Sequence, residues 1–131
     1  MSEIKKNEPT GDLISRTVAM PANTNANGDI FGGWILSLMD LSGGIVARDC
    51  SGSRVVTIAV NTMSFLHPVH VADIVSCFAK VQTIGRTSMK VAIEVWVDRH
   101  LKKQRLCVTE GLFTYVAVDA EGTAIAVKKS A

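Results

Sequence analysis

The chain has 131 residues, of which 47% are hydrophobic and 20% charged, and its formal net charge is +2. This length fits a single domain, and the apolar fraction excludes an intrinsically disordered protein while leaving material for both a core and a buried subunit interface. The small net charge, with only 5% aromatic residues, argues against a nucleic-acid-binding protein.

The chain ends and the cysteines indicate the compartment. Residues 1–11 are polar and lack the apolar region of a signal peptide, and no apolar stretch is long enough to span a bilayer. Cys50, Cys77 and Cys107 lie far apart in apolar segments, which is typical of reduced, buried thiols. We therefore expect a cytoplasmic protein without membrane association, with polar tails at 1–11 and 126–131 and one domain at 12–125.

The first half of the chain predicts a strand, a loop and a helix. Residues 13–20 form a short strand that Pro21 ends, and residues 21–29 contain three asparagines and an Asn-Gly step, as expected of a loop. From Gly33 to Cys50 apolar residues fall on nearly every helical face, which is typical of a buried helix. Residues 51–53 (SGS) end it.

Strand-like segments follow at residues 54–65, 73–84, 87–98 and 106–119, and the tail can add a short last strand. Segment 87–98 alternates strictly between apolar and polar residues, the pattern of a half-buried antiparallel strand. The order predicts an α+β fold in which an antiparallel sheet of five to six strands wraps around one long central helix. Covering the open side of that helix requires a second subunit.

Asp40 is the most informative residue of the predicted helix. Leu36, Leu38, Met39 and Leu41 surround it in the sequence, and it is too far from either helix end to act as a cap. An ionised carboxylate in apolar surroundings is costly unless it is paired or hydrogen-bonded. Asp40 can therefore be a functional acid, or it can reach solvent or an internal arginine; composition leaves both open.

The glycines before the helix favour the functional interpretation. Gly28, Gly32 and Gly33 leave backbone N–H groups accessible at the positively polarised helix N-terminus, where a thioester oxyanion would be stabilised. Gly33 and Asp40 are seven residues apart and therefore share one helix face. Turn geometry alone also explains the glycines. A phosphate-binding loop does not fit, because the Lys-Ser/Thr pair of such loops is missing and Asp29 would repel phosphate.

The other polar residues suggest no nucleophile and no metal site. His67, His70 and His100 lie in loops or at strand ends, and none is on the helix with Asp40. Ser42 has no neighbouring histidine, and the sequence has no Gly-x-Ser-x-Gly elbow.

A cationic turn lies between two predicted strands. Gly85, Arg86, Thr87 and Ser88 offer a guanidinium, two hydroxyls and backbone donors, which can hold a phosphate, and Arg54 can add a second guanidinium. An ordinary hairpin with a solvated arginine explains the same residues, and the pattern alone favours it.

Several segments together resemble one family: residues 23–34 (NTNANGDIFGGW), 39–40 (MD), 54–57 (RVVT), 94–97 (EVWV) and 115–119 (YVAVD). On these segments the chain resembles the YciA-type acyl-CoA thioesterases of the hotdog fold, over most of its length. One departure is Ala72, where relatives usually have glycine before the aspartate, here Asp73. It affects a turn and not the chemistry.

The resemblance implies hydrolysis of acyl-CoA thioesters with broad tolerance of acyl length, no metal, no cofactor apart from the CoA of the substrate, and assembly as a trimer of hotdog dimers. It makes Asp40 the catalytic carboxylate, acting as general base on water or as nucleophile through an anhydride. It implies that Asn25 contributes from the other subunit and that Gly33 supplies the oxyanion N–H. Hexamer and tetramer both remain open.

For coenzyme A, the resemblance places the turn at residues 85–88 where the family binds the nucleotide end, and Arg54 and Thr57 of the matched segment join it. A non-catalytic hotdog module that senses CoA or a nucleotide is the alternative, and it would not need a buried acid. A hotdog dehydratase is disfavoured, because it needs a histidine near the helix.

Overall fold

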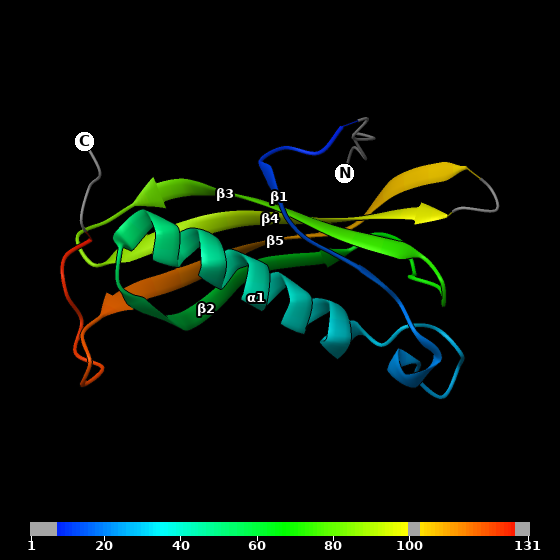
Figure 1. The fold of residues 1–131 in the computed structure, drawn as a ribbon, viewed down its shortest axis with the longest axis horizontal. Helices are drawn as coiled ribbons and strands as arrows, with labels where there is room; N and C mark the ends of the chain where they lie inside the picture. The colour runs from blue at the N-terminus through cyan, green and yellow to red at the C-terminus, as the bar shows by residue number, and fades with distance from the viewer. Residues whose placement is uncertain (1–7, 100–102, 128–131) are drawn as a thin grey trace.

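The computed structural model describes residues 8–99 and 103–127; most of the two predicted tails and His100 lie outside this part. One α-helix packs against a five-stranded antiparallel sheet (Figure 1), which is the expected hotdog arrangement. The elements in chain order are β1 (Asp12–Val18), a 3-10 turn η1 (Pro21–Asn23), α1 (Gly32–Ser51), β2 (Arg54–Phe65), β3 (Ile74–Ile84), β4 (Ser88–Arg99) and β5 (Gln104–Val118).

The strand order across the sheet is β1-β3-β4-β5-β2, so β2 pairs with β5 at the far end of the chain and not with β3, which follows it. The sheet has five strands in the described residues. The possible sixth is reduced to one isolated bridge between Val118 and Ala124. β1 and β2 are the two edges, and the 12 residues of β2 make the longer one.

The helix α1 buries one face against the sheet and exposes the other. Its buried residues recur at helical spacing: Ile35, Met39, Ser42, Gly43, Ala47 and Ser51. Leu36, Leu41 and Ile45 remain exposed, although their apolar side chains favour burial. The described part of the chain leaves these three side chains uncovered. No helix in the described part has the length and apolarity needed to cross a membrane.

The loop between β2 and β3 holds the segment that enters α1. The Ile30 N–H donates a 3.0 Å hydrogen bond to the Val69 carbonyl. Arg99 at the end of β4 fixes this loop, because it donates to the Pro68 carbonyl at 2.5 Å and forms a 3.2 Å ion pair with buried Asp73. The start of the helix is thereby tied to the sheet.

The backbone at Ala72 has a conformation that glycine adopts more readily than alanine. Its φ is +77°, in the left-handed region that disfavours residues with a Cβ, and its N–H donates to the Ala19 carbonyl at 2.8 Å. The turn keeps this backbone conformation despite the strain.

Replacing Ala72 by glycine should therefore raise the free energy of unfolding by about 1 kcal/mol, because the left-handed strain outweighs the greater freedom of glycine in the unfolded chain. Urea unfolding at fixed protein concentration measures this. Ala26→Gly is the control, since Ala26 is exposed in a loop without a positive φ. If Ala72→Gly raises the free energy of unfolding no more than Ala26→Gly does, the backbone at Ala72 is not strained.

Candidate active site

Asp40 lies in the third turn of α1, half-buried, with its carboxylate directed at the sheet. The Thr57 hydroxyl of β2 donates a 2.7 Å hydrogen bond to Asp40 Oδ1. On the neighbouring strand β5, Tyr115 pairs directly with Thr57. The sheet register thus brings two hydroxyls side by side under the helix carboxylate.

Tyr115 completes this arrangement. Its side chain is only 1% exposed, and its hydroxyl lies 3.1 Å from Asp40 Oδ1 and 3.0 Å from the Asp40 backbone carbonyl. Gly43, one helical turn after Asp40, makes room for it, because a Cβ there would lie 2.3 Å from the phenolic oxygen. The close approach of helix and sheet therefore depends on that glycine.

The phenol stays protonated and can act only as a donor to the carboxylate. Burial, and then the neighbouring charge of Asp40 and their hydrogen bond, raise the pKa of Tyr115 well above its ordinary value. Both donors bind Oδ1, and Oδ2 accepts no hydrogen bond from any described residue. One carboxylate oxygen is held in place while the other remains available.

The N-terminus of α1 is uncapped. The N-cap residue is Phe31, whose side chain makes no capping hydrogen bond, and the amides of Gly32 and Gly33 find no acceptor in the described part of the chain. Gly33 is exposed, and the Phe31 ring lies beside it. Seven residues of helix, about 10 Å along the axis, separate Gly33 from Asp40, so the two share a helix without contact.

Asn25 lies in the loop before the helix and does not contact Asp40 of its own chain. Its Oδ1 accepts hydrogen bonds from the backbone N–H groups of Asn27 (2.9 Å) and Asp29 (3.2 Å). These bonds fix the amide orientation, and the NH2 group of this exposed residue donates to no described residue.

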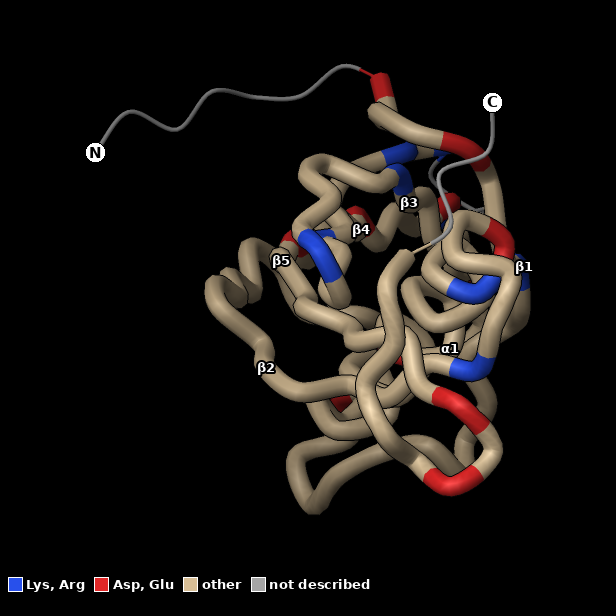
Figure 2. The backbone as a smooth tube through the Cα atoms, turned by 90° about the vertical axis from the view of Figure 1, so that its left-hand side faces the viewer, with Lys and Arg blue, Asp and Glu red and all other residues tan. Residues whose placement is uncertain are grey.

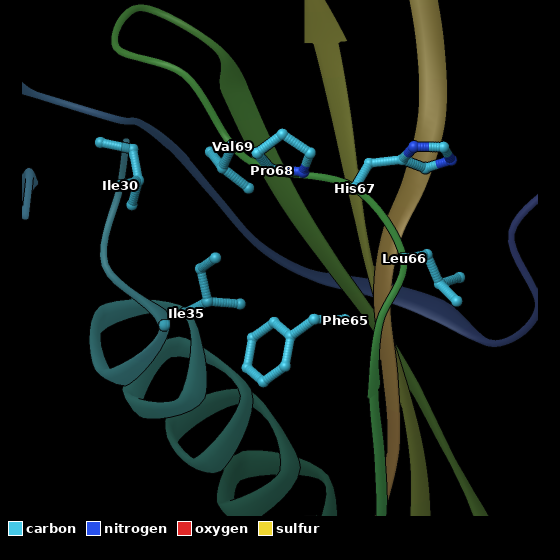
Figure 3. A pocket seen from close by; sticks show the side chains of 8 residues that line it. Ile30, Ile35, Phe65, Leu66, His67, Pro68 and Val69 are labelled. Carbon is cyan, nitrogen blue, oxygen red and sulfur yellow. The ribbon is translucent and has the colours of Figure 1, made fainter. Parts of the chain in front are cut away.

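An apolar cavity of about 360 Å³ opens beside the uncapped helix terminus. Its walls come from the segment entering α1, the first helical turn and the loop after β2: Ile30, Gly32, Ile35, Phe65, Leu66, His67, Pro68 and Val69. In Figure 3 the Phe65 ring faces Ile35 across the cavity, whereas the His67 imidazole points away from the helix. The cavity suits an apolar ligand next to free backbone donors.

The residues predicted to bind coenzyme A lie at one end of the sheet. Arg86, in the turn from β3 to β4, is exposed and has no ion pair with a described residue. The Arg54 guanidinium donates a 2.9 Å hydrogen bond to the Ala120 carbonyl and therefore contacts the turn after β5. Thr57 contacts Asp40, which makes it part of the carboxylate site.

Sequence reasoning missed the roles of Tyr115 and Gly43. Two signals were available: Tyr115 is the only tyrosine and lies in an apolar strand, where a buried phenol needs a hydrogen-bond partner. Gly43 follows Asp40 by three residues, on the same helix face. Within residues 8–99 and 103–127, no three His, Cys, Asp or Glu side chains are grouped to hold a metal ion.

Comparison with known proteins identifies the family. Residues 27–103 match the thioesterase superfamily, and the chain is 54% identical over 119 residues to the Escherichia coli acyl-CoA thioester hydrolase YciA, covering 88% of this chain and 90% of that protein. This chain belongs to the thioesterase superfamily.

Two solved structures of acyl-CoA-hydrolysing enzymes are similar to this chain in fold and sequence. A hexameric broad specificity acyl-coenzyme A thioesterase matches with a TM-score of 0.89 and 45% identity, covering 95% of this chain and 86% of that one. The acyl-CoA hydrolase of Staphylococcus aureus, characterised with butyryl coenzyme A, coenzyme A and coenzyme A disulfide, matches with a TM-score of 0.81 and 28% identity, over 88% and 70% of the two chains.

Because Tyr115 is the only tyrosine, phenolate absorbance reports on this contact directly. The unfolded chain should ionise at about pH 10, and the folded protein only at higher pH. Above about pH 10 the unfolded state therefore loses a proton that the folded state keeps, and the free energy of unfolding falls as pH rises.

Asp40→Asn should lower the pH at which the folded phenol ionises, because it removes the neighbouring negative charge. Between neutral and alkaline pH, the free energy of unfolding of Tyr115→Phe should fall less than that of the wild type, because the variant has no phenol to ionise. If the phenol ionises at the same pH in the folded and the unfolded protein, the buried contact between Tyr115 and Asp40 does not exist.

Proposed function

We propose that this member of the thioesterase superfamily hydrolyses acyl-CoA thioesters and that Asp40 carries the reaction. The observation that supports it is the half-buried carboxylate, fixed through Oδ1 by two hydroxyls and open at Oδ2. As a base, Asp40 takes a proton from water while the water oxygen bonds to the thioester carbon. The C–S bond then breaks, and the proton passes to the departing sulfur, giving a carboxylic acid and free CoA.

Asp40 can instead attack the carbonyl itself, forming a mixed anhydride and releasing the CoA thiolate, and water then cleaves the anhydride. Both routes need no serine or cysteine nucleophile, which suits a thioester because its carbonyl is a reactive electrophile. Both routes also develop negative charge on the carbonyl oxygen, which backbone N–H donors stabilise.

Gly33 provides that donor in our proposal, and the apolar cavity beside it takes the acyl chain. The uncapped amides of the first helical turn and the apolar lining support this placement. Asn25 and Gly33 belong to one segment, so a partner subunit that presents Asn25 to Asp40 presents Gly33 as well. The NH2 group of Asn25 is suited to holding water or the carbonyl.

The proposed phosphate site combines Arg86 with the backbone and hydroxyls of the turn at residues 85–88. The Arg86 guanidinium supports it, because it is exposed and forms no ion pair with a described residue. In the sheet register Ser88 pairs with Val116, which pairs with Val56, so this turn lies at the same end of the sheet as Arg54. CoA enters as part of the substrate, and no separate cofactor takes part in the proposed reaction.

A dimer through β2 is the proposed minimal unit, assembling further into a hexamer as in the hexameric relative. β2 has a free edge, and after Arg54 it carries no charged residue (Figure 2). Val56, Ile58 and Val60 on β2 are all exposed, as are the apolar residues of α1 described above. An unpaired, apolar edge strand of 12 residues favours pairing with a second copy. The three free cysteines support the cytoplasm as the compartment.

Asp40→Asn should lower kcat by about 10²- to 10⁴-fold, the range of a lost general base. The fold should be retained, because the amide oxygen can accept the same two hydrogen bonds. The measurement is hydrolysis of a panel of acyl-CoAs with a thiol reporter. Asp49→Asn, exposed in the same helix, is the matched control and should keep its activity. Full hydrolysis by Asp40→Asn would refute the assignment.

A further inference from the structure

The two hydroxyls on Asp40 Oδ1 differ in what holds them. Thr57 lies on the exposed edge strand β2, whereas Tyr115 is buried within the sheet. We propose that Tyr115 is a positioning residue that locks the Asp40 carboxylate with Oδ1 toward the sheet, so that Oδ2 is the oxygen that reacts. This inference rests on the proposed thioesterase function and assigns a further residue to it.

The hydroxyl of Tyr115 is fixed relative to the helix backbone. It has one proton, and both acceptors within reach, Oδ1 at 3.1 Å and the main-chain carbonyl at 3.0 Å, belong to Asp40. The charged Oδ1 is the stronger acceptor and takes the proton, while the backbone carbonyl keeps the phenolic oxygen beside this residue. Tyr115 thereby fixes the orientation of the Asp40 side chain relative to the Asp40 backbone.

The surroundings of Tyr115 leave it little freedom. Its ring stacks on Phe113 with centroids 6.4 Å apart, and the space left by Gly43 is filled by its hydroxyl and by the end of the Ile93 side chain. A buried side chain held on several sides keeps its rotamer. Thr57 lies on the outermost strand of the sheet and lacks this packing within its own chain, so it alone would hold the carboxylate less firmly.

The arrangement also decides which carboxylate oxygen is basic. An oxygen that accepts two hydrogen bonds has its lone pairs engaged, and Oδ2 accepts none from the described residues. Since the phenol remains neutral, it stays a donor throughout the working pH range. Oδ2 thus faces water or the thioester with its lone pairs free.

A role in packing alone makes a different prediction. Phenylalanine fills the same space as tyrosine apart from one oxygen, so Tyr115→Phe removes the contact with Asp40 while preserving the ring and its stacking. If Tyr115 only packs, the variant will keep its kcat. If it positions Asp40, kcat will fall while substrate binding is unchanged.

The test is steady-state hydrolysis of one acyl-CoA by the intact oligomer of the wild type, Tyr115→Phe and Val97→Ala. Val97 is fully buried on β4 and does not touch Asp40, so its variant controls for lost core packing. We expect Tyr115→Phe to lower kcat by about 10- to 100-fold with KM unchanged, as for loss of one hydrogen bond to a charged group. Val97→Ala should keep the wild-type kcat.

A Tyr115→Phe enzyme with wild-type kcat, or one whose loss is shared by Val97→Ala, would overturn the proposal. A rise in KM without a fall in kcat would also overturn it, because that assigns Tyr115 to substrate binding. Failure of the wild type to hydrolyse any acyl-CoA would instead refute the proposed function itself. The two failures are therefore distinguishable.

Discussion

The arrangement of the molecule depends on one contact, between the Asp40 carboxylate of the helix and the hydroxyls of Thr57 and Tyr115 in the sheet. A carboxylate in an apolar helix is costly unless it is hydrogen-bonded, and these donors meet that requirement on one oxygen only. The contact requires the helix to approach the sheet closely, which Gly43 permits. The bonds that stabilise this half-buried charge therefore also orient it in the proposed reaction.

A single chain leaves an apolar helix face and a sheet edge exposed, and it keeps the proposed site residues apart. Leu36, Leu41 and Ile45 on α1 and the free edge of β2 are exposed, and Asn25 and Gly33 lie away from the Asp40 of their own chain. One proposal accounts for both observations, since a second copy seated on β2 would cover the apolar face and bring its own helix entrance to the carboxylate. Association and catalysis then require the same surface.

Much of the fold follows from sequence pattern. The predicted strand at 54–65 matches β2 at both ends, and the helix extends only one residue further at each end than expected. Pairing of β2 with β5 is a long-range choice that periodicity does not encode. Asp40 could be selected because a lone carboxylate conflicts with its apolar neighbours. For Tyr115, the only tyrosine in an apolar strand, the sequence signals the need for a hydrogen-bond partner. The partner itself could not be predicted, because Asp40 lies 75 residues away and the contact is set by the sheet register. The family resemblance predicted Thr57 as a CoA-binding residue. In the structure its hydroxyl donates a hydrogen bond to Asp40 Oδ1.

The most direct test of the central claim, an Asp40 site completed by a second subunit, is complementation between two inactive variants. Asp40→Asn and Asn25→Ala oligomers are mixed, dissociated and reassembled, and acyl-CoA hydrolysis is measured. We expect about a quarter of the wild-type activity, because half of the dimers are mixed and each mixed dimer has one intact site. Activity no higher than that of the separate variants would contradict a shared site.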